Sequence, residues 1–172
     1  MKHALWAACA VAVVATFAFA PARAGSPHDF LRDAIRGDNS EIMLGRIGEH
    51  RAATPAARSF AQMLVDDHGR AKSEALRLAV RLHVRPPRGP EKEALKERGR
   101  LRRLSGWEFD REFAQYMVKD HQKDIAKFQR EANSGRGATS TLARRELPTL
   151  HKHLDVALSL DQHMARYTQG KP

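Results

Sequence analysis

The sequence predicts an all-α protein, a four-helix bundle with a long connection between its second and third helices. Apolar residues recur at helical spacing in four stretches, and no stretch shows the strict alternation of a half-buried strand. A nine-residue motif also occurs twice, as FAQMLVDDH at 60–68 and as FAQYMVKDH at 113–121. A near-copy of this length indicates two related helical units, each placing one histidine at the same height.

The N-terminal segment has the pattern of a secretory signal peptide. A short basic opening is followed by an apolar run over 4–20, and Ala22-Arg23-Ala24 places small residues at the positions that a signal peptidase reads. The run is short for a membrane span, which needs roughly 20 apolar residues. We therefore expect a signal peptide over 1–24 with cleavage after Ala24, a periplasmic or secreted protein, and a single bundle domain over 25–172. An uncleaved N-terminal anchor is the alternative.

Cysteine usage and charge narrow the chemistry. The single cysteine, Cys9, lies in the apolar run, so residues 25–172 offer neither a disulfide nor a thiolate metal site. A metal ion would have to be held by His, Asp or Glu. The chain carries 30 Lys and Arg against 20 Asp and Glu, a formal net charge of +10. An exported basic protein can meet anionic lipid or lipopolysaccharide, although a solvated basic surface is the simpler interpretation.

Capping signals and breakers set the predicted helix ends. Ser26-Pro27 and Thr54-Pro55 each combine a capping residue with a proline suited to the first helical position. The proline-rich stretch 85–90 ends the second helix. A short exposed helix is expected in the crossover, and Ser105 with Glu108 has the spacing of a capping box. The predicted long helices span 27–50, 55–83, 106–133 and 140–167, and the crossover spans 84–105.

Each predicted apolar stripe contains one strong metal-ligand residue near its middle. These are Glu41, His68, His121 and His153, and Asp124 flanks the third. At 1.5 Å per residue their heights agree to within about one helical turn. Burying such groups costs several kcal/mol unless they are paired or bound to a metal. The set suits one divalent transition metal, namely Zn, Fe, Mn, Co, Ni or Cu. The alternative is a metal-free hydrogen-bonded Glu–His network.

Other polar residues near these positions have weaker predicted roles. Asp67 and Asp120 precede the motif histidines and are expected on the flank or surface, where they can orient an imidazole of a neighbouring helix. Glu146 shares the face of His153 two turns earlier. The histidines expected at the surface are His50, His151 and His163.

The segment 81–103 is strongly basic, with nine Lys or Arg against three Glu. The segment can contact an anionic surface. The simpler interpretation is a charged crossover that is exposed to solvent. No aromatic side chains are interleaved to stack on bases, which argues against nucleic acid. The candidate contact residues are Arg98, Arg100, Arg102 and Arg103.

Five sequence blocks resemble a known family. They are EIMLGRIG, FAQMLVDDH, SGWEFDREF, MVKDHQKDI and LPTLHKHL, and they occur in the family's order between about 30 and 160. The family is the exported bacterial proteins of domain-of-unknown-function family 4142.

The resemblance implies a ferritin-like helical bundle, an envelope location and a metal site, with no established reaction. The family's recurring polar positions match Glu41, His68, His121, Asp124 and His153. Two positions depart from the family's pattern, because Phe113 is often Tyr and Lys72 is often Asn in the family.

Three functions are compatible with the sequence. The first is a metal-binding protein used for metal handling or stress tolerance. The second is a non-catalytic envelope or stress interaction protein whose buried polar layer is structural. The third is a di-metal oxidase or peroxide scavenger. Dinuclear bundles use two Glu and two Glu-x-x-His pairs. Here only His121-x-x-Asp124 comes close, in reversed order, so an enzyme is the less favoured interpretation.

Overall fold

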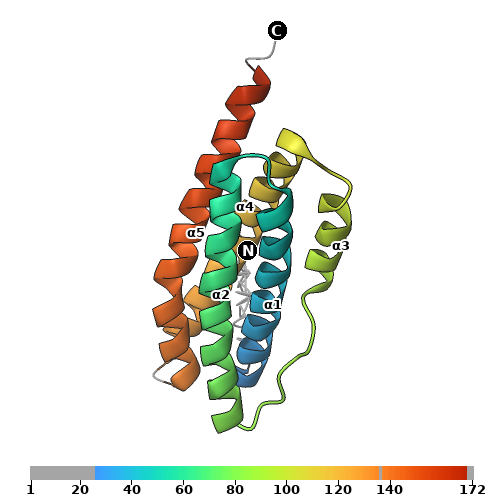
Figure 1. Ribbon diagram of the computed structural model, residues 1–172. Helices are drawn as coiled ribbons and strands as arrows, with labels where there is room; N and C mark the ends of the chain where they lie inside the picture. Colours follow the sequence, from blue (N-terminus) through green and yellow to red (C-terminus); the bar gives the residue numbers. More distant parts are fainter. Residues whose placement is uncertain (1–25, 136, 170–172) are drawn as a thin grey trace, which may run out of the picture.

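The computed structural model describes residues 26–135 and 137–169, and all the regular structure in these residues is helical. The long helices are α1 (Pro27–Arg51), α2 (Pro55–Arg81), α4 (Gly106–Asn133) and α5 (Ala138–Gln169). A short helix, α3 (Lys92–Leu101), lies in the connection between α2 and α4. Figure 1 shows the long helices side by side, with α3 outside them. The predicted all-α bundle with a helix in its crossover is confirmed.

The predicted signal peptide, 1–24, falls outside the described residues. Among the helices that the structure does describe, none combines the length and the apolar character needed to cross a bilayer.

The first two helices begin as their sequences predict. Ser26 and Thr54 each accept a hydrogen bond from the backbone N–H three residues later, and a proline follows each of them. The capping box predicted at α4 is wrong, because the side chain of Ser105 makes no capping hydrogen bond. Gly106, the next residue, has a left-handed φ of 62°, so the chain enters α4 with a different backbone geometry.

Small residues allow α1 and α2 to pack closely. A Cβ atom added at Gly48 would lie 2.6 Å from Ala61 Cβ and 3.1 Å from Phe113 Cζ. A Cβ atom at Gly45 would lie 3.0 Å from the Ala61 carbonyl oxygen. Larger residues here would force the two helices apart. The close approach brings the inner face of α2 next to α1.

The four long helices form two hairpins, α1–α2 and α4–α5, and Asp110 of α4 ties the first to the second. The carboxylate of Asp110 is buried and accepts the backbone N–H groups of Ala53 and Thr54, each at 2.8 Å. These donors lie in the turn between α1 and α2, where helix geometry gives them no partner. Asp110 therefore fixes one end of the bundle.

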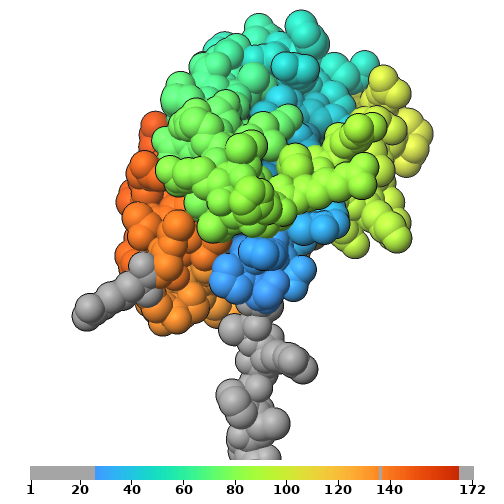
Figure 2. All heavy atoms as spheres, turned by 90° about the horizontal axis from the view of Figure 1, so that it is seen from below, coloured from blue at the N-terminus to red at the C-terminus, as the bar shows by residue number. Residues whose placement is uncertain are grey.

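The crossover is held against α1. Asn39 Nδ2 donates to the Gly89 carbonyl at 3.3 Å, and the Glu91 N–H donates to Ser40 Oγ at 2.9 Å. Helix α3 buries Ala94 and Leu101 in the same apolar cluster as residues of α1 and α4. Figure 2 shows the segment after α2 crossing beside the start of α1 on its way to α3. This arrangement covers the α1–α4 side of the bundle.

A polar layer interrupts the apolar core. One apolar cluster, with Phe60 and Phe113, fills the end of the bundle near the α1–α2 turn. Two smaller clusters, around Leu31 and Phe128, fill the other end. Between them lie titratable side chains that are all less than a tenth exposed, namely Asp38, Glu41, His68, Asp120, His121, Asp124 and His153.

Candidate metal centre

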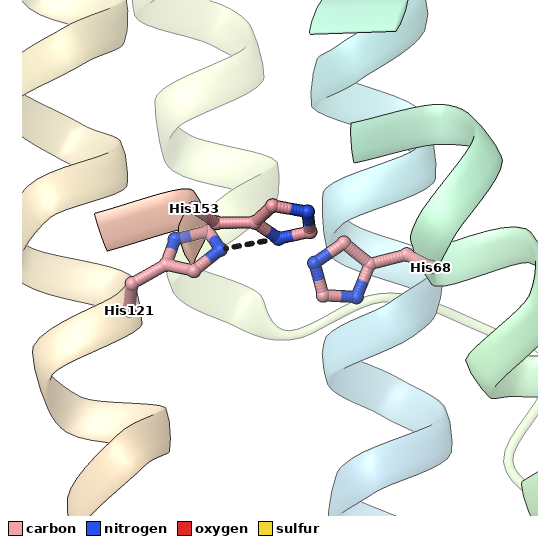
Figure 3. Close-up of side chains that lie close together, drawn as sticks. All are labelled: His68, His121 and His153. Carbon is pink, nitrogen blue, oxygen red and sulfur yellow. Dashed lines mark hydrogen bonds between the residues drawn. The ribbon is translucent and has the colours of Figure 1, made fainter. Parts of the chain in front are cut away.

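Three histidines converge at the centre of the polar layer. His68 comes from α2, His121 from α4 and His153 from α5, and their exposed fractions are 5%, 2% and 0%. One ring nitrogen of each lies within 4.8 Å of those of the other two. Figure 3 shows the three rings turned toward one another. Helical spacing alone predicted this convergence for these three residues.

Each imidazole uses its other ring nitrogen for a hydrogen bond directed away from the group. In every case the partner is an oxygen that accepts. The pairs are His68 Nδ1 with Asp38 Oδ1 at 3.0 Å, His121 Nδ1 with the Met117 carbonyl at 2.9 Å, and His153 Nε2 with Asp67 Oδ2 at 2.9 Å.

These outer partners determine the tautomers. Since carboxylate and carbonyl oxygens accept, each ring must carry its proton on the outer nitrogen, which leaves a lone pair on the inner one. The inner atoms are Nε2 of His68, Nε2 of His121 and Nδ1 of His153. Metal-ligating histidines are commonly oriented by such outer carboxylate or carbonyl partners. Three lone pairs are thus directed into one buried space.

The spacing of the inner nitrogens fits a small cation. His121 Nε2 and His153 Nδ1 are 3.3 Å apart, which is a hydrogen-bond distance and is the contact marked by the dashed line in Figure 3. When both rings carry their protons on the outer nitrogens, two lone pairs face each other at this contact, and a positive charge between them relieves the repulsion. Two nitrogen ligands of a tetrahedral zinc ion, each about 2.05 Å from the metal, are also about 3.3 Å apart. His68 Nε2 makes no hydrogen bond within the described residues. The three donors therefore suit a divalent transition metal.

The pKa values of His121 and His153 favour neutral rings at neutral pH. Burial, reinforced by the neighbouring imidazole of His68, lowers the pKa of His121 well below 6.5 and that of His153 to about 4. Burial alone would raise the pKa of Asp67, but the hydrogen bond from His153 and the charge of Arg70 outweigh it and hold that pKa below its usual value. Asp67 stays ionised, so the tautomer of His153 is fixed.

A second group of polar side chains lies on the α1–α4 side of the layer. Glu41 is 1% exposed, and neither of its carboxylate oxygens makes a hydrogen bond with any residue that the structure describes. Burial, and then the charge of Asp120, raise the pKa of Glu41 well above 4.5. Burial, and then Asp124, raise the pKa of Asp120 to about 6. Burial and the charge of Asp120 also raise the pKa of Tyr116. These groups keep their protons to a higher pH than usual, up to about 6 for Asp120, whereas burial makes the imidazoles of His121 and His153 lose theirs at a lower pH than usual.

The two predicted carboxylate ligands lie outside the close histidine group. Neither Glu41 nor Asp124 is among the groups whose ligand atoms lie within 4.8 Å of one another. Asp124 is directed toward α1, where its Oδ2 lies 3.3 Å from the Cβ position of Gly37, and its Oδ1 accepts from Lys127 at 3.0 Å. Of the five predicted ligands, the structure brings the three imidazoles together and leaves the two carboxylates beside them.

The residues expected on the flanks are more buried than helical spacing predicts. Asp120 is 9% exposed and faces Glu41 rather than an imidazole, and the side chain of Asp67 is 16% exposed and bonds His153. Asp120 is buried because α1 packs against α4 beside it, and Asp67 is largely buried because α5 packs against α2 beside it. Glu146 is half-buried and lines a small cavity that also touches His68, without bonding a ring.

The sequence analysis missed Asp38, which orients His68. A signal was present, because residues 34, 38, 41, 45 and 48 follow the spacing of one helical face. Burial raises the pKa of Asp38, and the hydrogen bond and charge of His68 partly offset this effect. The charge of the half-buried Lys72 also acts to lower the pKa of Asp38.

The remaining predicted groups lie away from this centre. His50, His151 and His163 are exposed. Among the crossover arginines, Arg100 is paired with Glu112 at 2.8 Å and Arg98 is half-buried. Arg102 and Arg103 are exposed, so they are the members of that set that solvent can reach without breaking an ion pair.

The fold and the centre together define an all-helical bundle with a buried trio of imidazoles suited to a metal ion. The chain matches the family described as Domain of unknown function (DUF4142) over residues 12–160, and it belongs to that family. The resemblance seen in the sequence blocks is confirmed.

Among solved structures, the chain is similar to the crystal structure of a DUF305 fragment from Deinococcus radiodurans. The TM-score is 0.70 at 16% sequence identity, covering 83% of this chain and 98% of that chain. At this identity the likeness shows the fold alone. No curated protein matches the chain.

Proposed function

We propose that the protein binds one divalent transition-metal ion through His68 Nε2, His121 Nε2 and His153 Nδ1. The observation that carries the proposal is that each ring already has an acceptor on its outer nitrogen. Three inward lone pairs then share one buried space, and a cation satisfies all of them at once. A metal-free network would leave the 3.3 Å contact between two of the rings without a proton at neutral pH.

The donor set favours particular metals. Imidazole nitrogens suit Zn, Cu, Fe and Ni, and no cysteine thiolate is available from the described residues. The trio leaves the fourth position of a tetrahedral ion for Glu41, whose oxygens make no hydrogen bond within the described chain, for Asp124, or for a water molecule. Binding through Glu41 would require it to lose its proton, which a nearby dication favours.

The proposed role is metal handling or stress tolerance in the cell envelope, by binding rather than by catalysis. The envelope location is supported by the signal-peptide pattern of residues 1–24. A two-metal oxidase is less well supported, because the close group consists of imidazoles and contains no carboxylate to bridge two ions.

The test is a titration of the metal-free protein, without a histidine tag, with Co²⁺ as a spectroscopic substitute for zinc. We expect one equivalent to bind and to give the intense visible absorption of a tetrahedral site. His121→Ala should weaken binding at least about 100-fold, since one of three ligands is lost. His151→Ala is the matched control, because His151 is an exposed histidine only two residues from His153 on the same helix.

Two outcomes would contradict the proposal. One is a stoichiometry far below one equivalent for Co²⁺, Zn²⁺ and Cu²⁺ alike. The other is equal binding by the wild type and His121→Ala, which would place the bound ion at surface groups.

A second candidate function, contact with anionic lipid or lipopolysaccharide, is favoured by one surface feature. An open groove of about 380 Å³ is lined by Arg46, Ile47, His50, Arg51 and Arg102. The guanidinium of Arg51 is held there by donating to the Leu104 carbonyl at 2.7 Å. The groove lining has basic groups and no carboxylate, which suits a phosphate group.

Binding to vesicles that contain anionic lipid tests this contact. Arg46→Gln with Arg102→Gln should reduce binding at physiological salt by at least about fivefold, since each basic group near a membrane surface contributes about 1 kcal/mol. The control is the exposed pair Arg32→Gln and Arg130→Gln, which removes the same charge elsewhere. If this pair reduces binding as much as the groove pair does, only net charge matters.

A further inference from the structure

A small cavity touches the metal centre on one side. It has a volume of about 20 Å³, roughly the space of one water molecule. His68 lines it, and so do the carboxyl groups of Asp38, Asp67, Asp124 and Glu146. Apart from Asp67 and His68, its lining residues lie on the side of the histidine layer away from the Phe60–Phe113 pair.

A wider hollow at the surface adjoins this cavity. The hollow has a volume of about 190 Å³ and is more open than the inner cavity. The two spaces share four lining residues, Asp67, Ala71, Glu146 and Thr149. Asp67 and Ala71 belong to α2, and Glu146 and Thr149 belong to α5, so the spaces follow the seam between these helices. Figure 1 shows α2 and α5 side by side over the part of the bundle that holds these residues.

Packing obstructs three other directions. Toward the α1–α2 turn, Phe60 packs edge-on to both Phe113 and the ring of His153. The α1–α2 seam is narrowed by the approach of Gly45 and Gly48 to α2, and α3 covers the α1–α4 side. The α2–α5 seam is the side on which an open hollow adjoins the cavity that His68 lines.

Carboxylates follow this seam from the surface inward. At the mouth, Arg145 pairs with Glu74 at 2.9 Å and Arg70 pairs with Asp67. Glu146 lines both spaces and makes no hydrogen bond or ion pair with the described residues. Burial raises the pKa of Glu146, and the charges of Asp38 on the inner side and Glu74 on the outer side raise it further. Glu146 thus lies between the inner and the outer carboxylates.

We propose that the α2–α5 seam is the route by which a divalent metal ion reaches the three histidines, and that Glu146 is the carboxylate that transfers the ion from the mouth to His68. The proposal rests on the metal site proposed above. Carboxylate oxygens hold a borderline metal less strongly than three imidazoles do, so Glu146 binds in transit and the histidines retain the ion. His68 is the first histidine met, and its Nε2 makes no hydrogen bond within the described residues.

A residue that acts only on the route changes both rates and not the equilibrium. We therefore expect Glu146→Gln to slow the uptake of Co²⁺ by the metal-free full chain, and its release to excess chelator, each by about tenfold or more. The dissociation constant should change by less than about threefold. Ala71→Leu places a larger side chain where the two spaces meet, so it should also slow uptake and release without changing the dissociation constant. Asp155→Asn is the matched control, because it removes the same charge from an exposed position of α5 outside both spaces.

Stopped-flow absorbance gives the rates, equilibrium titration gives the affinity, and circular dichroism checks that each variant is folded. If Glu146→Gln and Ala71→Leu bind Co²⁺ as fast as the wild type with normal affinity, the route is overturned and the metal site stands. Faster release with unchanged uptake would make Glu146 a ligand, which also overturns the route. A wild-type chain that takes up no ion would overturn the metal site and the route together.

Discussion

The polar layer has two sides that are built differently. On the histidine side, every outer ring nitrogen has an acceptor, and the inner nitrogens face one another. On the carboxylate side, Glu41 and the hydroxyl of Tyr116 are buried without hydrogen bonds to the described residues. Asp120 is crowded against Glu41 on the same side. Burial acts on both sides, but it removes protons from imidazoles and retains them on carboxyl groups.

This difference indicates which side is preset for a cation. Outer hydrogen bonds fix both the orientation and the tautomer of a ligand before the metal arrives. Glu41 has no such bonds and must lose a proton before it can bind. The histidine side is thus ready to accept an ion, and the carboxylate side adjusts to it.

Acidification should act on the two sides in opposite directions in the metal-free protein. The stability that neutral His153 contributes is fully present above pH 6.5 and is lost as the pH falls toward about 4. The stability that protonated Asp120 contributes is present below 3.8 and is lost as the pH rises through about 6. The two effects partly cancel between pH 7 and 4.5. Asp120→Asn removes the compensation, so its free energy of unfolding should fall over this range by on the order of 2 kcal/mol more than that of the wild type.

Urea denaturation at pH 7 and pH 4.5, with chelator present, measures this difference. Identical pH profiles for the wild type and Asp120→Asn would show that the carboxylate side does not titrate as described.

The outer acceptors of the histidine side should matter more for metal affinity than the carboxylate side does. Asp67→Asn replaces the fixed acceptor of His153 by an amide and should weaken Zn²⁺ binding by about 10- to 100-fold. Asp38→Asn should act similarly through His68. A competition assay against a chelator of known affinity measures both. Asp66→Asn is the control, since Asp66 is the exposed neighbour of Asp67. A loss in Asp66→Asn as large as in Asp67→Asn would mean that surface charge, not orientation, sets the affinity.

Neutralising Glu41 should stabilise the metal-free protein. Glu41→Gln keeps the size of the side chain and removes the cost of either protonating the carboxyl group on folding or burying its charge, so the free energy of unfolding at pH 8 should rise by about 1 kcal/mol. Thermal and urea unfolding measure the change. If Glu41→Gln is instead destabilising by more than about 2 kcal/mol, the Glu41 carboxylate has a partner that the description above lacks.

The smallest effect is expected at Tyr116. Tyr116→Phe removes a buried hydroxyl that makes no hydrogen bond with the described residues, so stability should change by less than about 0.5 kcal/mol. Urea denaturation of the wild type and Tyr116→Phe measures this change in the free energy of unfolding. A loss above about 1.5 kcal/mol would show that the hydroxyl donates to a carboxyl group of this side.

The sequence predicted the bundle and the three imidazoles because both follow from one periodicity. Apolar stripes define the inner faces, and a histidine within a stripe has only the core to enter. The orienting partners are harder to predict, because they depend on which helix packs on which flank. Asp67 looks like a surface residue on α2 alone, and only the position of α5 makes it the acceptor of His153. Asp124 shares the inner face of α4, but the space left by Gly37 and the charge of Lys127 direct its carboxylate elsewhere.

The distribution of the three histidines between the hairpins has a kinetic consequence. His68 belongs to the α1–α2 hairpin, and His121 and His153 belong to the α4–α5 hairpin. Each hairpin relies on contacts between residues close in sequence, which form early in folding, whereas the trio assembles only once the hairpins have docked. An ion held by all three would therefore do little to the folding rate. It would slow the separation of the hairpins and lengthen the lifetime of the native state, so that removing the ion would shorten that lifetime.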